Sequence, residues 1–159
     1  MIYCLDANTL IEAKNLHYAM DFCPAFWQML ENENGKGQVF SIDFIAKELA
    51  KGNDELTDWA RSNKNLFIET SDIETQMVYI EIVNYVNDNY SEVEARKFLD
   101  VADPWLIAKC KTMNATLVTK EVLARGAKKV KIPNICEIFE VKYMQTHEMI
   151  RALGVQFIL

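Results

Sequence analysis

Four acidic residues, separated along the chain, are the side chains of this sequence best suited to act together. They are Asp6, Glu48, Asp103 and Glu121. Carboxylates brought close together repel one another, so such a cluster is stable only when it is protonated or neutralised by a cation. Oxygen ligands of this kind suit Mg²⁺ or Mn²⁺. Two such ions about 3.5–4 Å apart can orient a water molecule and stabilise both oxygens of an in-line phosphodiester displacement.

Each of these acids also has an ordinary structural interpretation. Asp6 could cap the turn that follows it, and Asp103 could serve only as a helix N-cap. Glu48 could pair with a neighbouring lysine on the solvated face of its helix, and Glu121 could be a surface charge among lysines. Taken one at a time, the residues leave both interpretations open.

The elements that must position these acids read as an α/β arrangement. Short apolar runs predict strands over residues 2–5, 39–41, 66–68, 115–119 and 130–132, with a last edge strand over 155–159. Helical patterns fall between them, which is typical of a mainly parallel sheet flanked by helices. No repeat or domain boundary interrupts the pattern, so we expect a single domain over residues 1–159.

Local signals predict where most of the helices begin. Ser41 or Asp43 is expected to cap a helix that runs to about residue 51, and Asp103 followed by Pro104 is expected to begin a helix that ends near 113. Capping boxes at 71–74 and 91–94 predict helices over about 72–87 and 91–99. Further helices are predicted over residues 9–14, from Pro24 to about 34, 135–139 and 144–153.

This arrangement predicts where three of the acids meet. The ligand crevice of a parallel α/β sheet lies at the carboxyl ends of its strands. Asp6 directly follows the first strand, and Glu121 comes two residues after the strand that ends at Thr119. Asp103 stands at a helix start, where a loop arrives from the same edge. We therefore expect all three to face one crevice.

The distribution of charge bears on the partner. The formal net charge is −6, which by itself argues against a nucleic-acid ligand. Residues 109–131, however, hold seven basic side chains against the single acid Glu121, and a local positive face can attract phosphates whatever the total charge. A solvated lysine-rich surface is the alternative. Beside Glu121, the segment favours phosphate contacts from Lys120, Lys128 and Lys129.

Other classes of site are poorly supported. The four cysteines show no C-x-x-C spacing, and His17 and His147 are far apart in sequence, so a zinc site is not expected and the thiols are predicted to be reduced and mostly buried. No glycine-rich nucleotide loop occurs. Neither a signal peptide nor an apolar run of membrane-spanning length is visible, and we expect a cytoplasmic protein with no membrane partner.

Four motifs, taken in order, resemble those of the PIN-domain family. They are the segments 3–11 (YCLDANTLI), 44–49 (FIAKEL), 103–108 (DPWLIA) and 117–121 (LVTKE). The resemblance covers residues 2 to about 135 and implies a three-layer fold in which Asp6, Glu48, Asp103 and Glu121 hold the metal. It also implies that Asn8 and Thr119 are polar supports of the site. Many PIN domains of this size are VapC-like ribonuclease toxins that are held inactive by an antitoxin.

The sequence departs from the family pattern at two places. Its fourth acid is Glu121 where the family usually has Asp, which adds one methylene. Asp103 is followed by proline, and Asp100, one turn earlier, is an alternate ligand. The tail from Ile132 onward resembles a less characterised branch of the family.

The working hypothesis from sequence is therefore Mg²⁺- or Mn²⁺-dependent hydrolysis of RNA, with the toxin of a toxin–antitoxin pair as the biological context. The alternative is a catalytically degenerate PIN domain that binds nucleic acid or protein. A phospho-receiver with Asp6 as acceptor is a third, weaker hypothesis. Aromatic and methionine side chains outside the site are expected to be mostly core, with some forming a homodimer face or an antitoxin groove.

Overall fold

A parallel five-stranded sheet organises the computed structural model, which describes residues 1–159. Its strands are β1 (Tyr3–Leu5), β2 (Val39–Ile42), β3 (Phe67–Ile68), β4 (Thr116–Val118) and β5 (Tyr143–Met144), in the order β3-β2-β1-β4-β5. Tyr3 of β1 stands opposite Val39 on one side and Thr116 on the other. Every neighbouring pair is parallel, as the sequence predicts. The direction of winding reverses between β1 and β4.

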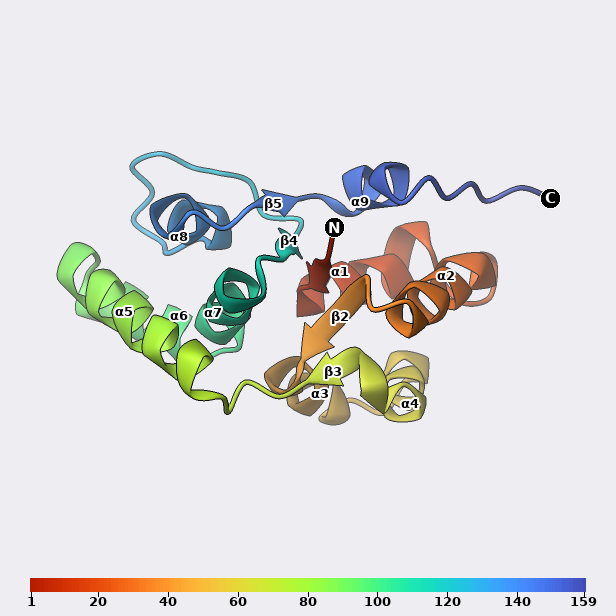
Figure 1. The fold of residues 1–159 in the computed structure, drawn as a ribbon, viewed down its shortest axis with the longest axis horizontal. Helices are drawn as coiled ribbons and strands as arrows, with labels where there is room; N and C mark the ends of the chain where they lie inside the picture. Colours follow the sequence, from red (N-terminus) through yellow and green to blue (C-terminus); the bar gives the residue numbers. More distant parts are fainter.

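Helices cover both faces of this sheet (Figure 1). On one side lie α5 (Ile73–Asn89), α6 (Glu92–Leu99), α7 (Asp103–Met113) and α8 (Ile132–Phe139). On the other lie α2 (Pro24–Gly35), α4 (Glu55–Ser62) and α9 (Thr146–Ala152). The remaining helical segments are α1 (Ala7–Glu12), a π-helical turn over Ala13–His17, α3 (Asp43–Ala50) and a 3-10 turn over Lys64–Leu66. The three-layer α/β arrangement predicted from sequence is thereby confirmed.

One connected core of 37 buried hydrophobic residues lies between the layers. The central strands are buried throughout, because both faces of the sheet are covered by helices. All four cysteines are free thiols, and Cys4, Cys110 and Cys136 are among the core residues. The prediction of reduced and mostly buried thiols is confirmed.

The predicted strands near the C-terminus are wrong. Residues 130–132 form no strand, because Ile132 begins α8 and Pro133 occupies its first turn, where a missing N–H costs nothing. The segment 155–159 pairs with no strand. The edge position belongs to β5 (Tyr143–Met144), whose second residue was assigned to a predicted helix. A short apolar run does not by itself show whether the segment will pair with a neighbouring strand.

Several predicted helix starts are also corrected. The N-cap of α3 is Ile42, whereas the Ser41 hydroxyl donates to the carbonyl of Leu5 at 2.7 Å. The N-cap of α5 is Asp72, which accepts from the Thr75 N–H, so the capping box predicted at 71–74 is wrong. Ser91 does cap α6. Helix α4 was not anticipated at all.

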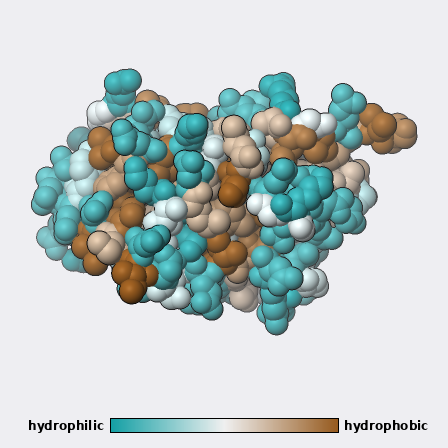
Figure 2. All heavy atoms as spheres, in the orientation of Figure 1, coloured by the Kyte–Doolittle hydropathy of each residue, from teal (hydrophilic) through white to brown (hydrophobic).

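The surface is largely polar (Figure 2). Brown, hydrophobic atoms stand out over α5 and at the projecting C-terminus, where Ile73, Met77, Ile80, Ile158 and Leu159 are exposed. Most aromatic residues pack in or against the core, as expected, although Phe22 is exposed. None of the helices combines the length and apolar character that crossing a bilayer demands.

Candidate functional site

The four predicted acids line a single cavity of about 380 Å³. Asp6 follows β1 and Glu121 follows β4, so both stand at the carboxyl edge of the sheet, where the strand order reverses. Ligand crevices of parallel α/β folds form at this place. Glu48 reaches the cavity from α3 and Asp103 from the first turn of α7. The structure therefore brings together all four side chains selected from the sequence.

Asp6 is buried, with 2% of its surface exposed. Its Oδ1 accepts the Asn8 N–H at 3.4 Å, so it caps α1, and its Oδ2 accepts the Thr119 hydroxyl at 3.0 Å. Burial raises the pKa of Asp6 to about 6. The bonds from Thr119 and Asn8 oppose that rise in pKa, whereas the charge of Glu121 adds to it. Capping is thus only one of the tasks of this carboxylate.

Asp103 is only partly buried, and its carboxyl group does not cap its own helix. Ala102 is the N-cap of α7 and no side chain caps it, so the prediction that Asp103 is the N-cap is wrong. Burial, followed by the charges of Asp6 and Glu121, raises the pKa of Asp103 to about 8, with Lys129 acting in the opposite direction. Positive charge placed beside this carboxyl group would lower its pKa again.

The two glutamates are held by backbone groups rather than by lysines. Glu48 accepts the Ala102 N–H at 3.2 Å, just before Asp103, and Glu121 accepts the Ile132 N–H at 2.7 Å, at the start of α8. Each bond uses one carboxylate oxygen. The Glu121 N–H in turn donates to the Thr119 hydroxyl at 3.2 Å. Glu48 does not form the ion pair with a neighbouring lysine that was its alternative interpretation, and Glu121 is not a free surface charge.

The carboxylate oxygens at this cavity are of the type that a hard divalent cation prefers, but they are not close enough together to enclose one. Asp6 and Asp103 line the same cavity and both have raised pKa values, and positive charge there would relieve the repulsion between nearby carboxylates. No three His, Cys, Asp or Glu side chains stand close enough together to hold an ion as they are placed. The glutamate side chains can turn about more bonds than the aspartates and are the more able of the four to change position.

The supporting residues predicted from sequence are only partly gathered at this cavity. Asn8 lines it, and Thr119 binds Asp6, whereas the alternate ligand Asp100 is exposed at the C-cap of α6 and is not among the lining residues. Lys129 lines the cavity and Lys128 does not. The predicted lysine Lys120 instead pairs with Glu12 at 3.2 Å, in a neighbouring cavity.

A family profile described as "Domain of unknown function (DUF4411)" matches residues 3–157. The chain belongs to the DUF4411 family. No curated protein matches the sequence.

Two solved structures share the fold of this DUF4411 protein over most of its length. One is VapBC2 from Rickettsia felis bound to a DNA fragment from their promoter, with a TM-score of 0.56 and 15% identity. The other is VapBC-1 from nontypeable Haemophilus influenzae, with a TM-score of 0.55 and 14% identity. Each likeness covers 91% of this chain and 98% of the other. Because VapC is a PIN-domain protein, the predicted PIN-like fold is confirmed.

Sequence reasoning missed two charged residues at the acidic cavity of the DUF4411 protein. Glu94 and Lys97 of α6 both line it and form an ion pair of 3.4 Å. Glu94 had been noticed only as the last residue of the capping box at 91–94. Its position next to the site follows from the packing of α6 against α7, for which the sequence carries no local signal.

Proposed function

We propose that this DUF4411 protein is a metal-dependent endoribonuclease that uses Mg²⁺ or Mn²⁺ at the acidic cavity. The observation that supports this most directly is the pairing of Asp6 with Asp103. They lie far apart in sequence, yet they line one cavity, and the charge of Asp6 is among the causes that raise the pKa of Asp103. Keeping a buried and a partly buried carboxylate ionised in one cavity is costly, and a bound cation would offset that cost.

Each side chain has a distinct part in this proposal. Asp6 and Asp103 are the principal ligands, and Glu48 and Glu121 bind directly or through water. The ion, when bound, acidifies a water molecule and stabilises charge at the phosphate. Thr119 and Asn8 fix the orientation of Asp6 through the hydrogen bonds described above.

The RNA backbone is proposed to follow the positive side of the cavity. Lys129 lies in the cavity itself, and the exposed Lys128 stands next to it in the chain. Lys120 lies directly before Glu121. Contacts of this kind position a nucleic acid through its phosphates and depend on salt, and they carry little sequence information.

A cognate antitoxin is the proposed partner, and the chain is proposed to be the toxin of such a pair in the cytoplasm. The support is the fold shared with the two VapBC structures. Expression in bacteria should arrest growth, and Asp6→Asn should relieve that arrest. Co-expression of a small protein encoded next to this chain should relieve it as well. A homodimer is also proposed, and light scattering should give the mass of two chains rather than one.

A catalytically degenerate PIN domain remains the second candidate, and two observations favour it. Both glutamates already accept backbone N–H groups, and no three acidic side chains are close enough together to hold an ion. Such a protein would bind nucleic acid or another protein without taking up metal. Calorimetric titration with Mn²⁺ separates the two candidates, because only the nuclease requires a binding isotherm.

Cleavage of RNA by the purified protein tests the main proposal. We expect cleavage with Mn²⁺ that EDTA abolishes, and a loss of at least about 100-fold in rate for Asp6→Asn or Asp103→Asn, equivalent to about 2.7 kcal/mol. Asp100→Asn is the matched control, since Asp100 is an exposed acid outside the cavity, and it should keep its activity. Equal cleavage by all three variants would point to a contaminating nuclease and remove the assignment.

A further inference from the structure

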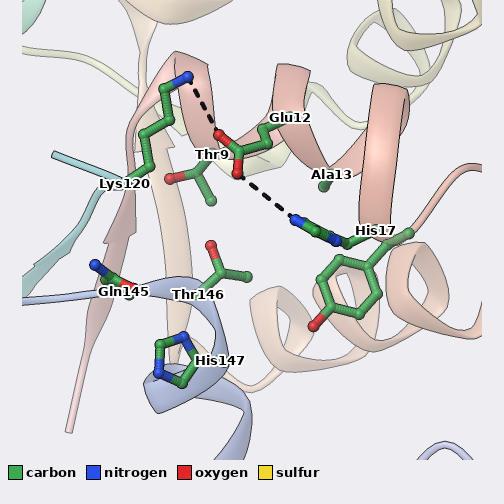
Figure 3. A pocket seen from close by; sticks show the side chains of 9 residues that line it. Thr9, Glu12, Ala13, His17, Lys120, Gln145, Thr146 and His147 are labelled. Atoms are coloured by element: carbon green, nitrogen blue, oxygen red, sulfur yellow. Dashed lines mark ion pairs between the residues drawn. The ribbon is translucent and has the colours of Figure 1, made fainter.

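A second cavity, of about 310 Å³, lies at the same edge of the sheet. Three segments line it: α1 with the π-helical turn, Lys120 in the loop after β4, and the start of α9 (Figure 3). His17 and His147, the chain's only histidines, come from opposite ends of the sequence and both line this cavity. A π-helical turn is itself a rare element that occurs often at functional sites.

This second cavity adjoins the acidic one through two short pieces of chain. Helix α1 contributes Asn8 to the acidic cavity and Thr9 to the second one. After β4, Thr119 binds Asp6, the next residue Lys120 lines the second cavity, and Glu121 lines the acidic cavity. Lys120 in the second cavity is therefore the immediate chain neighbour of Glu121, one of the proposed metal ligands.

One wall of the second cavity is a chain of charged groups. Glu12 lies between Lys120 and His17, with Oε2 at 3.2 Å from the lysine Nζ and Oε1 at 3.8 Å from the imidazole Nε2 (Figure 3). Glu12 thereby positions both groups at the rim. Because its negative charge stands in the wall, a bare anion gains less here than in a purely basic pocket.

The opposite wall offers polar groups that the protein leaves free. Gln145 begins α9 and its side chain caps that helix together with Glu148. The Thr146 hydroxyl and the His147 imidazole form no hydrogen bond within the protein, and both residues line the cavity (Figure 3). The cavity thus combines imidazole and phenol rings, hydroxyl groups and one lysine.

We infer that this second cavity receives one unpaired nucleotide of the RNA, adjacent to the phosphodiester that the acidic cavity cleaves; the inference rests on the proposed ribonuclease function. Proteins recognise single-stranded RNA by stacking splayed bases on aromatic rings, histidine included, and by hydrogen bonds to the base edges. His17 and His147 supply the rings, Thr146 the edge contact, and Lys120 the contact to the phosphate. The volume is at the lower end for ligand pockets, which suits one nucleotide rather than several.

Nuclear magnetic resonance of the histidine side chains tests occupancy of the cavity without any need for cleavage. Because both histidines line it, their two sets of ring signals report on this cavity alone. Short single-stranded oligoribonucleotides, titrated in EDTA at constant pH, should shift both sets. Inorganic phosphate should shift neither to a comparable extent. An equal response to phosphate would reduce the cavity to an anion site, and no response to any oligoribonucleotide would overturn the inference.

Affinity measurements on variants give a second test. In EDTA, the double variant with His17→Ala and His147→Ala should bind a labelled single-stranded RNA about tenfold more weakly than the wild type, the size expected for one lost stacking site. Lys64→Ala is the control for general charge effects, since Lys64 lies before β3 at the other end of the sheet. Equal affinity of the double variant and the wild type would overturn the inference.

Cleavage assays then distinguish failure of the ribonuclease proposal from failure of the nucleotide-site inference. If RNA shifts the histidine signals but no metal supports hydrolysis, the nuclease proposal fails and the nucleotide site stands. If the protein cleaves RNA while the histidine signals and the affinity of the double variant are unchanged, the nuclease stands and the nucleotide site fails. A signal shift produced only by a protein partner would assign the cavity to that partner instead.

Discussion

The Thr119 hydroxyl donates a 3.0 Å hydrogen bond to Asp6, joining the ends of β4 and β1 at the base of the acidic cavity. The same hydroxyl oxygen accepts the N–H of Glu121. One small side chain therefore sets the positions of two proposed metal ligands that are far apart in sequence. Partners of this kind orient the groups that bind a metal and tune its affinity.

Removal of this hydroxyl is the first prediction. Thr119→Val keeps the shape of the side chain but leaves Asp6 with one donor fewer, so we expect Mn²⁺ affinity to fall about tenfold, as is usual when such supporting contacts are lost. Calorimetry at a fixed pH measures this. Thr116→Val, in β4 just before, is the matched control because the Thr116 side chain forms no hydrogen bond to the four acids and does not line the acidic cavity. Equal affinities for the two variants would contradict the role given to Thr119.

The stability of the metal-free protein should fall as the pH rises from about 4 to 8. Burial raises the pKa of Asp6 from 3.8 to about 6 and that of Asp103 to about 8. Both therefore hold protons in the folded state that the unfolded chain releases. Their contribution is complete below pH 4 and is lost as the pH rises through 6 and then 8. For Asp6 alone this amounts to roughly 3 kcal/mol, or about 6–12 °C in melting temperature.

Thermal melts in EDTA measure this profile, and Asp103→Asn should flatten its upper part. Asp54 and Asp72 do not disturb the test. Hydrogen bonds from Lys14 and Lys109 lower the pKa values of these two carboxyls, so their contributions change only below pH 4. A melting temperature that increases between pH 5 and 8 in EDTA would contradict the raised pKa values of Asp6 and Asp103 in the folded protein.

Divalent metal should reverse the loss at high pH. At a concentration 100 times the dissociation constant, an ion that binds only the folded protein adds about 2.7 kcal/mol, which corresponds to about 5–11 °C in a chain of this length. We expect this increase with Mn²⁺ at pH 8 for the wild type and for Asp100→Asn. Asp6→Asn and Asp103→Asn should show little of it. An increase of the same size in all four proteins would place the ion elsewhere.

Shortening the fourth acid should affect structure as well as binding. The Oε2 atom of Glu121 accepts the Ile132 N–H at 2.7 Å and so holds the first turn of α8. Glu121→Asp removes one methylene and with it this bond, at a cost of about 1 kcal/mol. Glu121→Gln retains an acceptor at the same reach and should melt close to the wild type, while binding Mn²⁺ more weakly because its charge is gone. Identical melting of both variants would show that reach is unimportant here.

Salt dependence should reveal which lysine contacts a phosphate. Lys129 lines the acidic cavity and forms no ion pair within the protein. Lys129→Ala should weaken RNA binding in EDTA and lower the slope of log affinity against log salt by about 1. Lys64→Ala, at the far end of the sheet, should leave the slope unchanged. Equal slopes in both variants would remove Lys129 from the RNA path.

Local sequence patterns determined much of the scaffold and the identity of the acids. Apolar runs located β1, β2 and β4, and polar residues at their ends predicted Asp6 and Glu121 as neighbours across the sheet. These inferences succeed because strand burial and the crevice of a parallel sheet depend on periodicity and chain order, which are properties of the sequence itself.

Tertiary structure alone decided what each group does. In the folded chain Asp103 does not cap its helix, Asp100 lies outside the acidic cavity and Glu94 lines it. His17 and His147 both line a second cavity. Tertiary structure also placed the edge strand at β5 (Tyr143–Met144). All of these features depend on which surfaces pack together between segments far apart in the sequence. That packing is decided by burial and by contacts with distant residues, and a short segment of sequence specifies neither.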